Sequence, residues 1–375
     1  MKVQQISLLP YSWRDDISQL NIDANLLLLF MSPKFKERQE VLDYLNTKYP
    51  EAIITGCSTA GEISDIHVND FSVSLTAVQF EKVEQRLAVV QIEDMKFSYK
   101  SGQQLGTKLK ADDLKHLLVL SDGLNINGAD LVAGLRASLP EVSITGGLAA
   151  DGSDFNETFI IANDYIGDKH VVAVGFYGEH LKVGYSSKGG WDSFGIERLV
   201  TKSHKNVLYE LDGLPALEIY KSFLGSEADN LPSSALLFPI SMRDNENDRP
   251  LVRTILSVNE DDQSLTFAGN IHQGSYVRLM KANIDRLIKG SEQSAKVAND
   301  IFKESADLAI LISCVGRRLV LKQLIEEEVE VVREVVGDKP KITGFYSYGE
   351  IAPHGEFSPC ELHNQSMTIT TLSEC

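Results

Sequence analysis

The stretch ITGCSTAGEI at residues 54–63 returns near the end of the chain as ITGFYSYGEI at residues 342–351. Six of the ten positions are identical in register, and the middle four differ. A third ITG triplet stands at residues 144–146 and is followed by GLAADG. A similar pattern precedes every copy: an apolar run, a helical stretch and a proline. This repetition predicts that the fold contains several copies of one structural unit.

Each unit reads as a strand, a helix and a second strand. Short apolar runs bounded by turn residues are typical of strands buried on both faces. The segments between these runs and the triplets keep the spacing of an amphipathic helix. A strand, a crossover helix and a second parallel strand form a βαβ unit, which should be right-handed. The runs lie at residues 25–30, 116–120 and 307–313, and the helical segments at 34–49, 129–139 and 319–336.

The spacing of the triplets indicates how many units there are. Thr55 and Thr145 are 90 residues apart, whereas Thr145 and Thr343 are 198 apart, about twice as far. This difference suggests a degenerate fourth unit, with strands at residues 233–241 and 264–274.

The stretches that follow the triplets alternate between apolar and polar residues, for example at residues 71–80 and 365–372. Such alternation is typical of half-buried strands, so each sheet should be mixed. We expect an α/β fold of two related halves, each a mixed sheet with βαβ units flanked by helices. The composition changes between about residues 200 and 225, which predicts domains at 1–215 and 216–375.

Composition excludes several classes of protein. The chain has 375 residues and a net charge of −17, whereas binding to nucleic acid needs clustered Lys and Arg. We see no apolar run of the roughly 20 residues that span a bilayer, and the N-terminus does not read as a signal peptide. We therefore expect a cytoplasmic protein without membrane insertion. The oligomeric state is open, and a homo-oligomer is compatible with the sequence.

The four cysteines are far apart and form no CxxC pair, so the sequence predicts neither a structural zinc site nor a dithiol redox site. P-loop, GxGxxG, GxSxG and HExxH motifs are also missing from the sequence. We do not expect an enzyme. A weaker hypothesis is catalysis on a small carboxylate or carbonyl compound with Glu62 or Glu350 as acid–base, and it rests only on the clustering of titratable groups.

The ITG glycines should stand at the carboxyl ends of buried strands, where open α/β sheets bind ligands. The differing residues after each triplet would then line a site whose sides differ, in a cleft between the halves or at the strand ends. The plainer interpretation is that the glycines only permit tight turns. The candidate ligand-binding residues are Gly56, Cys57, Ser58, Thr59 and Glu62 in the first frame, Gly146 and Gly147 in the second, and Tyr346, Tyr348 and Glu350 in the third.

The C-terminal region is richest in functional side chains. Tyr348, Glu350 and His363, with Asn364 beside it, could converge on a small polar ligand. The alternative is a set of core aromatics with a hydrogen-bonded carboxylate and a structural histidine. Arg317, in SCVGRR at residues 313–318, follows a buried strand and would suit a carboxylate or phosphate.

Four motifs occur in a fixed order: TGCSTAGEI, TGGLAADG, SCVGR with GFYSYGEI, and CELHNQSMTITTL. Together they resemble the FIST family, whose chains have an N-terminal and a C-terminal FIST region. The resemblance covers nearly the whole chain and implies an intracellular sensory, ligand-binding module of signal transduction.

The chain is similar to stand-alone bacterial members of this family, which implies a haem-based nitric-oxide sensor that regulates a partner histidine kinase in a two-component system. Without a CxxCH motif such a haem b would be bound non-covalently, and its axial ligand would be His363, with His204 and His272 as rivals. The alternative that the resemblance implies is a sensor of a small amino-acid-like molecule.

Overall fold

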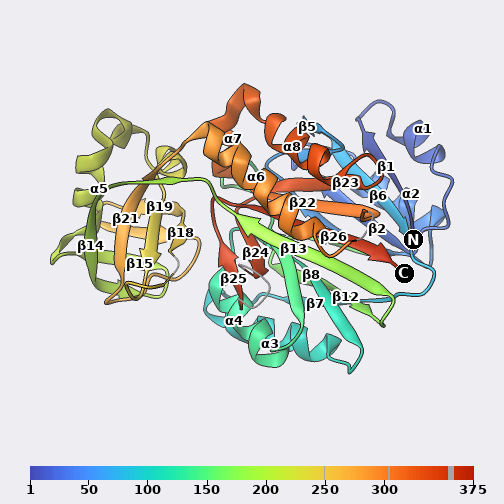
Figure 1. Ribbon diagram of the computed structural model, residues 1–375, viewed down its shortest axis with the longest axis horizontal. Coiled ribbons are helices and arrows are strands. Elements are labelled where there is room, and N and C mark those ends of the chain that lie inside the picture. Colours follow the sequence, from blue (N-terminus) through green and yellow to red (C-terminus); the bar gives the residue numbers. More distant parts are fainter. Residues whose placement is uncertain (249, 303–304, 354–358) are drawn as a thin grey trace.

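The computed structural model describes residues 1–248, 250–302, 305–353 and 359–375. It consists of a large α/β body and a smaller insert, residues 192–281, which projects from one end of the body (Figure 1). The chain enters the insert after β13 (Leu181–Lys188) and leaves it before α6 (Ile284–Asn299). No helix in the described part of the chain is long and apolar enough to cross a membrane.

The body contains three units of the same topology. In each unit the first two strands are parallel, and a third strand runs antiparallel to the first. The first unit is β2 (Leu26–Met31), α2 (Arg38–Lys48), β3 (Ile53–Ser58) and β6 (Val73–Gln79). The second is β8 (Leu114–Ser121), α4 (Gly128–Ser138), β9 (Ser143–Leu148) and β12 (His170–Tyr177). The third is β22 (Leu308–Cys314), α7 (Val315–Leu321), α8 (Glu327–Val336), β23 (Lys341–Ser347) and β26 (Met367–Glu374).

The predicted α/β class, with mixed sheets and flanking helices, is confirmed. A fourth strand pairs with the outer side of each unit: β1 (Lys2–Leu8) with β6, β7 (Glu84–Gln91) with β12, and β13 with β26. The helices α1 (Trp13–Ser18) and α2 pack on the first sheet, α3 (Ser98–Leu109) and α4 on the second, and α6 and α8 on the third (Figure 1).

The ITG glycines lie inside the second strand of each unit, at the same register. Gly56 is paired with Leu29, Gly146 with Val119 and Gly344 with Leu311. A Cβ atom on any of these glycines would overlap the carbonyl oxygen of its paired residue. The expectation that they stand directly after a strand, at a ligand-binding edge, is therefore wrong. They are needed because the neighbouring backbone approaches too closely for a side chain.

After its second strand, each unit sends a hairpin into the sheet of another unit. The hairpin of β4 (Glu62–Ser64) and β5 (His67–Asn69) joins the third sheet at β23. The hairpin of β10 (Ile160–Ala162) and β11 (Tyr165–Gly167) joins the first sheet at β3. The hairpin of β24 (Gly349–Pro353) and β25 (Cys360–His363) joins the second sheet at β9. The exchange is cyclic, so the body cannot be divided at one point of the sequence.

The three ITG frames meet in a ring of backbone hydrogen bonds. In each bond, the residue four positions after one glycine donates its N–H to the carbonyl two positions after another glycine. This ring explains why the same frame recurs in one chain: the copies are neighbours around a common centre. The bonds are Ala60 N–H to Tyr346 O (2.8 Å), Ala150 N–H to Ser58 O (3.0 Å) and Tyr348 N–H to Leu148 O (3.2 Å).

The residues that differ between the frames fill the space between the three sheets. Cys57 and Phe345 are buried in this central core, and the ring of Phe345 lies 4.7 Å from that of Phe30. A Cβ at Gly147 would lie 3.2 Å from the Phe345 ring and 2.7 Å from Ile312. Gly147 therefore leaves the room that Phe345 occupies. Cys57, Gly147 and Phe345 are packing residues around the centre and do not line an open site.

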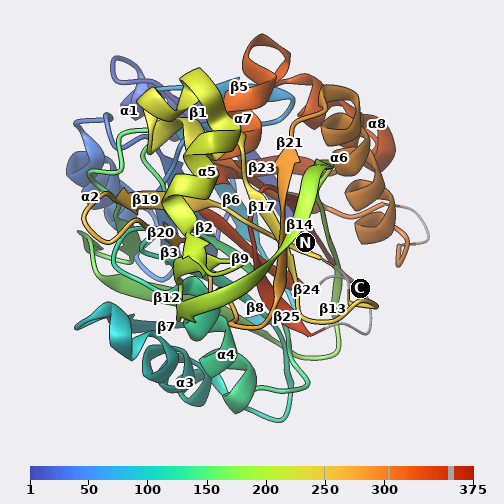
Figure 2. The same cartoon turned by 90° about the vertical axis from the view of Figure 1, so that its left-hand side faces the viewer.

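The insert has a different architecture, built from antiparallel strands only, with α5 (Ala216–Leu224) across them (Figure 2). The expected fourth unit is wrong: residues 233–241 form a 3-10 helix and β17, and residues 264–274 begin as β20. The doubled spacing between the triplets reflects the inserted residues. The strands are β14 (Asp192–His204), β15 (Val207–Leu211), β16 (Leu214–Pro215), β17 (Ile240–Arg243), β18 (Leu251–Arg253), β19 (Ile255–Asn259), β20 (Ser264–Phe267) and β21 (Tyr276–Lys281).

Candidate functional site

A hollow of about 310 Å³ lies where the insert meets the body, and we call it the junction hollow. Clefts between domains are frequent places for small-ligand sites, and this volume is near the lower end of their usual range. Its walls come from the end of β13 and the connector after it, from four strands of the insert (β14, β17, β18 and β21) and from the end of β25 and the segment after it. The lining residues are Ser187, Gly189, Gly190, Trp191, Ser193, Ser241, Pro250, Val252, Met280, His363, Asn364 and Ser366.

The walls of the junction hollow are polar on one part and apolar on another. The body contributes hydroxyl, amide and imidazole groups, the insert contributes the hydroxyls of Ser193 and Ser241, and Trp191, Met280 and Val252 are apolar. The described lining includes no Lys, Arg, Asp or Glu. Such a surface can hydrogen-bond an uncharged polar molecule and cover its apolar part.

The body wall is held in place by the buried carboxyl of Glu350. One oxygen accepts from Ser347 Oγ (2.7 Å), and the other accepts from Ser366 Oγ (2.8 Å) and Ser366 N–H (3.1 Å). Burial raises the pKa of Glu350 to about 8. The carboxyl therefore fixes the segment that carries His363 and Asn364 without entering the hollow itself.

Glu62 occupies the matching position in the first frame. Its oxygens accept from Thr59 Oγ1, from Ser72 Oγ (2.8 Å) and from Ser72 N–H (3.2 Å). Burial raises the pKa of Glu62 to about 7. Glu62 and Phe345 are partners across β4 and β23, so the two GEI-containing frames do lie side by side. They meet as strands of one sheet and not across a cleft.

The segment Leu362–Ser366 also holds the insert against the body. Arg253, which is 4% exposed, donates from Nη1 to the carbonyl of Leu362 (3.0 Å). Gln365 donates from Nε2 to the carbonyl of Leu236 and to Thr254 Oγ1, both at 3.0 Å. Asn364 Oδ1 accepts from Thr254 N–H (3.4 Å). One short segment therefore lines the junction hollow and docks the insert.

Trp191 fixes the connector that forms another wall. Its indole Nε1–H donates to the carbonyl of Gln365 (3.0 Å). The next residue, Asp192, pairs with Arg286 and accepts from Asn283 Nδ2 (3.1 Å). The two chain segments that connect insert and body are thus tied to each other and to the docking segment.

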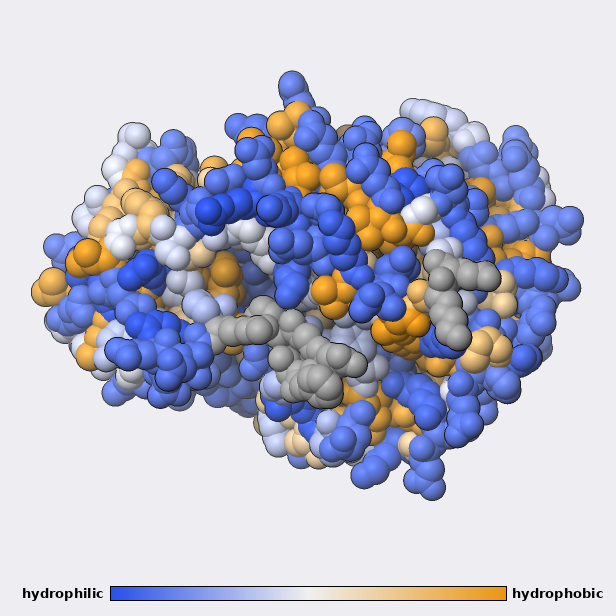
Figure 3. Space-filling view, in the orientation of Figure 1, coloured by the Kyte–Doolittle hydropathy of each residue, from blue (hydrophilic) through white to orange (hydrophobic). Residues whose placement is uncertain are grey.

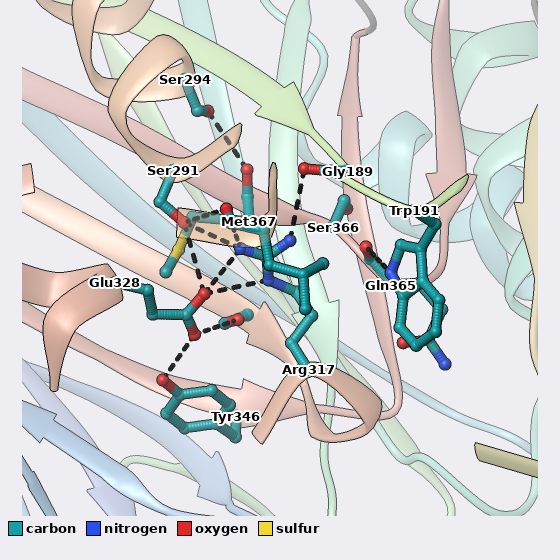
Figure 4. A network of polar contacts seen from close by, with 12 residues as sticks. Gly189, Trp191, Ser291, Ser294, Arg317, Glu328, Tyr346, Gln365, Ser366 and Met367 are labelled. Atoms are coloured by element: carbon teal, nitrogen blue, oxygen red, sulfur yellow. Dashed lines mark hydrogen bonds and ion pairs between the residues drawn. The ribbon is translucent and has the colours of Figure 1, made fainter. Parts of the chain in front are cut away.

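Arg317 is not available to a ligand. It is fully buried and pairs with the buried Glu328, with Nη2 and Nε at 2.6 and 3.0 Å from Oε2 (Figure 4). The other oxygen of Glu328 accepts from Ser313 Oγ (3.0 Å) and from the hydroxyl of Tyr346 (2.6 Å). Arg317 and Tyr346 therefore belong to a closed network beneath α6 and α8, and the structure offers neither to the junction hollow.

Other predicted site residues are also engaged inside the body. Ser58 Oγ accepts from Phe159 N–H (3.1 Å). The hydroxyl of Tyr348 donates to Asp151, and its ring stacks on Phe155 at 4.8 Å. Of the predicted set, the structure places His363 and Asn364 in the junction hollow. Thr59 and Glu62 line a separate hollow of about 160 Å³, beside Arg318.

The three candidate haem ligands do not come together. His363 Nε2 donates to the carbonyl of Ala352 (2.8 Å), whereas a nitrogen that ligates iron must be unprotonated. His204 is exposed at the end of β14, and His272 pairs with Asp244 at 2.9 Å on the surface. No group of three or more metal-ligating side chains occurs among the described residues. Haem b, nitric oxide and the kinase partner stay predictions.

The sequence analysis missed Trp191, Ser193, Ser241 and Met280. The only signal was the dipeptide Gly189-Gly190 before a tryptophan, which marks a connector in close contact with another segment. Arg318, the second arginine of SCVGRR, was not among the predicted site residues, yet it lies in the hollow beside Glu62.

Family models match nearly the whole length of the chain: the FIST N domain matches residues 25–214 and the FIST C domain residues 216–353. The chain belongs to the FIST family. FIST domains suggest a sensory, ligand-binding role in signal transduction. The sheets described above cross the border between the two FIST regions, since β4 pairs with β23 and β24 with β9.

An uncharacterized protein of Methanocaldococcus jannaschii is 25% identical over 341 residues. The match covers 81% of this chain and 62% of that protein, so the chain spans less than two thirds of its relative. Among solved structures, cyanuric acid hydrolase from A. caulinodans matches with a TM-score of 0.40 and 7% identity. That match covers 100% of this chain and 99% of the hydrolase.

Proposed function

We propose that this FIST protein senses a small, uncharged polar molecule that binds in the junction hollow. The observation that carries the proposal is the double use of the segment Leu362–Ser366, which lines the hollow and holds the insert. A ligand that contacts His363 or Asn364 acts on the same segment that accepts from Arg253 at the Leu362 carbonyl and from Thr254 at the Asn364 side chain. Binding therefore changes how firmly the insert is docked.

The character of the docking contacts supports a sensory role. Polar contacts between domains are typical of interfaces that can rearrange, whereas large apolar interfaces hold domains rigidly. A ligand shifts such an equilibrium only by its difference in affinity for the two arrangements. A molecule held between both walls of the hollow prefers the docked arrangement, because undocking separates Ser193 and Ser241 from His363 and Asn364.

The absence of full charges from the described lining favours an uncharged ligand over an amino-acid-like one. An amino acid brings an ammonium and a carboxylate, and a buried charge without a partner is costly. Serine hydroxyls and the Asn364 amide can pair instead with carbonyl and N–H groups. Trp191, Met280 and Val252 would then cover the apolar face of the ligand.

Tryptophan fluorescence offers a direct test, because the chain has two tryptophans and one of them, Trp191, lines the hollow. A Trp13→Phe variant leaves Trp191 as the single reporter. We expect nicotinamide, uracil or a related uncharged heterocyclic amide to change its emission saturably and to raise Tm. Glycine and glutamate should produce neither effect.

Two further variants locate the response. Ser241→Phe fills the hollow and should abolish the fluorescence change. Ser257→Phe, at an exposed position of the insert, should leave it intact. A response that survives Ser241→Phe, or one produced only by charged ligands, would show that the junction hollow is not the sensing site.

A further inference from the structure

We propose that the insert carries a second site, for a branched aliphatic group next to a carboxylate. The site is an apolar pocket between α5 and the strands of the insert, with a volume of about 30 Å³. Leu211, Ile219, Phe223, Leu265 and Leu279 contribute apolar side chains to its lining. The junction hollow and this pocket share no lining residue, so the second site does not depend on the first.

Two arginines give this apolar pocket its chemical character. Arg198 and Arg278 line it, and the Nε atom of each is buried without a hydrogen-bond partner among the described residues. A buried donor that lacks a partner is costly, and such groups in native proteins call for an explanation. The guanidinium of Arg198 lies 5.5 Å from the ring of Phe223, which places it against the apolar wall.

The existing acidic partners leave guanidinium donors unused. Arg198 donates from Nη1 to Asp212 (2.9 Å). Glu197 accepts from both Nε and Nη2 of Arg243, and the positive charge of Arg278 helps to lower the pKa of Glu197. A guanidinium has five N–H donors and matches a carboxylate in two-point contact. A ligand carboxylate can therefore bind beside Arg198 and Arg278 without removing Asp212 or Glu197.

The size of the pocket limits the apolar part of the ligand. A cavity needs about 10–15 Å³ of this volume for each water molecule, so the pocket holds about two or three waters or one short alkyl group. Apolar cavities stay dry and bind apolar groups. A long acyl chain is too large, whereas an isobutyl group fits. Such a group comes either from a free branched-chain carboxylic acid or from the C-terminal leucine of a peptide.

The surroundings of the pocket are accessible and apolar. Ile196, which also lines the pocket, is 65% exposed, and Leu199 and Leu214 of the insert are 36% and 55% exposed. Hydrophobic residues are visible at the end of the insert that points away from the body (Figure 3). A ligand can reach this pocket without displacing the insert.

Calorimetry with three small probes tests the proposal on the full chain. Isovalerate represents the free acid, N-acetyl-leucine represents a peptide C-terminus, and isoamylamine has a similar alkyl group with the opposite charge. We expect isovalerate or N-acetyl-leucine to bind, with the tighter one naming the source, and isoamylamine to fail. Arg198→Met should weaken binding about tenfold or more, as the loss of a charge-assisted hydrogen bond predicts.

Matched variants keep the test decisive. Lys202→Met removes an exposed cation from the same strand and should leave the affinity unchanged. Leu265→Phe fills the pocket and should abolish binding; if that variant does not fold, Arg278→Met must show the loss instead. Equal binding of the amine, equal affinity in Arg198→Met, or no binding of either acid overturns the proposal. The Trp191 response to uncharged ligands is expected to persist in every one of these variants.

Discussion

The body and the insert are held together by different means. In the body, three sheets exchange hairpins and meet in a ring of backbone hydrogen bonds, so each unit is completed by its neighbours. The insert is attached by two connectors, by polar contacts to the segment Leu362–Ser366 and by contacts with the start of α4. At α4, Asn270 is hydrogen-bonded to Asn127 and Asp130, and Lys205 pairs with Asp130. Leu236 of the insert also packs in the core of the body. On the proposed function, the body is a rigid frame and the insert a movable reporter, with the ligand site at their border.

The strongest expected effect lies in the ring at the centre of the body. Gly344→Ala places a methyl group on the carbonyl oxygen of Leu311. This oxygen cannot move away, because it belongs to the paired parallel strand. We expect a loss of more than about 4 kcal/mol of unfolding free energy, or failure to fold. Urea unfolding and soluble yield measure it. Gly189→Ala, where the nearest atoms are 3.7 and 3.9 Å away, is the matched control and should cost little.

The buried ion pair behind the third sheet should give the next largest effect. Arg317→Met leaves Glu328 buried with a charge and without its partner, which costs about 3–5 kcal/mol. Removing both charges in Arg317→Met/Glu328→Gln should recover part of that loss. Urea unfolding of the single and double variants tests this, and equal stabilities of the wild type and Arg317→Met would contradict it.

The two buried glutamates predict how stability depends on pH. Their pKa values are raised from 4.5 to about 7 in Glu62 and about 8 in Glu350. Because folding raises the pKa of each carboxyl, the folded state binds more protons than the unfolded state between pH 4.5 and the raised pKa. The stabilising contribution is complete below pH 4.5 and is lost as pH rises through 7 to 8. Each carboxyl contributes at most about 1.4 kcal/mol per pH unit within its window.

The measurement is Tm between pH 5 and pH 8.5. Tm of the wild type should fall over this range, and Glu62→Gln/Glu350→Gln should remove that fall. Glutamine can accept from Ser72 or Ser366 with its carbonyl and donate to Thr59 or Ser347 with its amide, so the contacts are kept. Glu51→Gln, an exposed control, should behave like the wild type. A double variant with the same pH dependence as the wild type would contradict the assignment.

The local part of the fold could be predicted from the sequence. The apolar runs and helical periods gave the βαβ units, because these patterns are set by burial within a short segment. The role of Gly56, Gly146 and Gly344 was misread, since a glycine after an apolar run can mark a turn or a close backbone approach equally well. The hairpin exchange joins residues far apart in sequence, and no local pattern encodes which sheet receives a hairpin.

The site was harder to predict for a related reason. Arg317 and Arg318 are neighbours, yet one is fully buried on Glu328 and the other lies in a hollow, because successive residues of a helix differ by about 100° in direction. Trp191 and Ser241 line the junction hollow only because the insert folds back onto the segment Leu362–Ser366. This docking joins residues that are far apart in the sequence, so the composition of residues 233–274 did not indicate it.

The smallest expected effect on stability addresses the insert itself. Arg253→Met removes the hydrogen bond to the Leu362 carbonyl and should cost about 1–3 kcal/mol, mostly in docking. The urea transition of the body should therefore change little, whereas the connectors at residues 189–191 and 282–283 should be cut faster by a protease. Limited proteolysis followed by mass spectrometry measures both rates. Lys221→Met, which removes a surface pair with Glu260 on the insert, is the control. If Arg253→Met lowers the stability of the body as much as Arg317→Met does, insert and body unfold as one unit, and the junction hollow cannot report its ligand through docking.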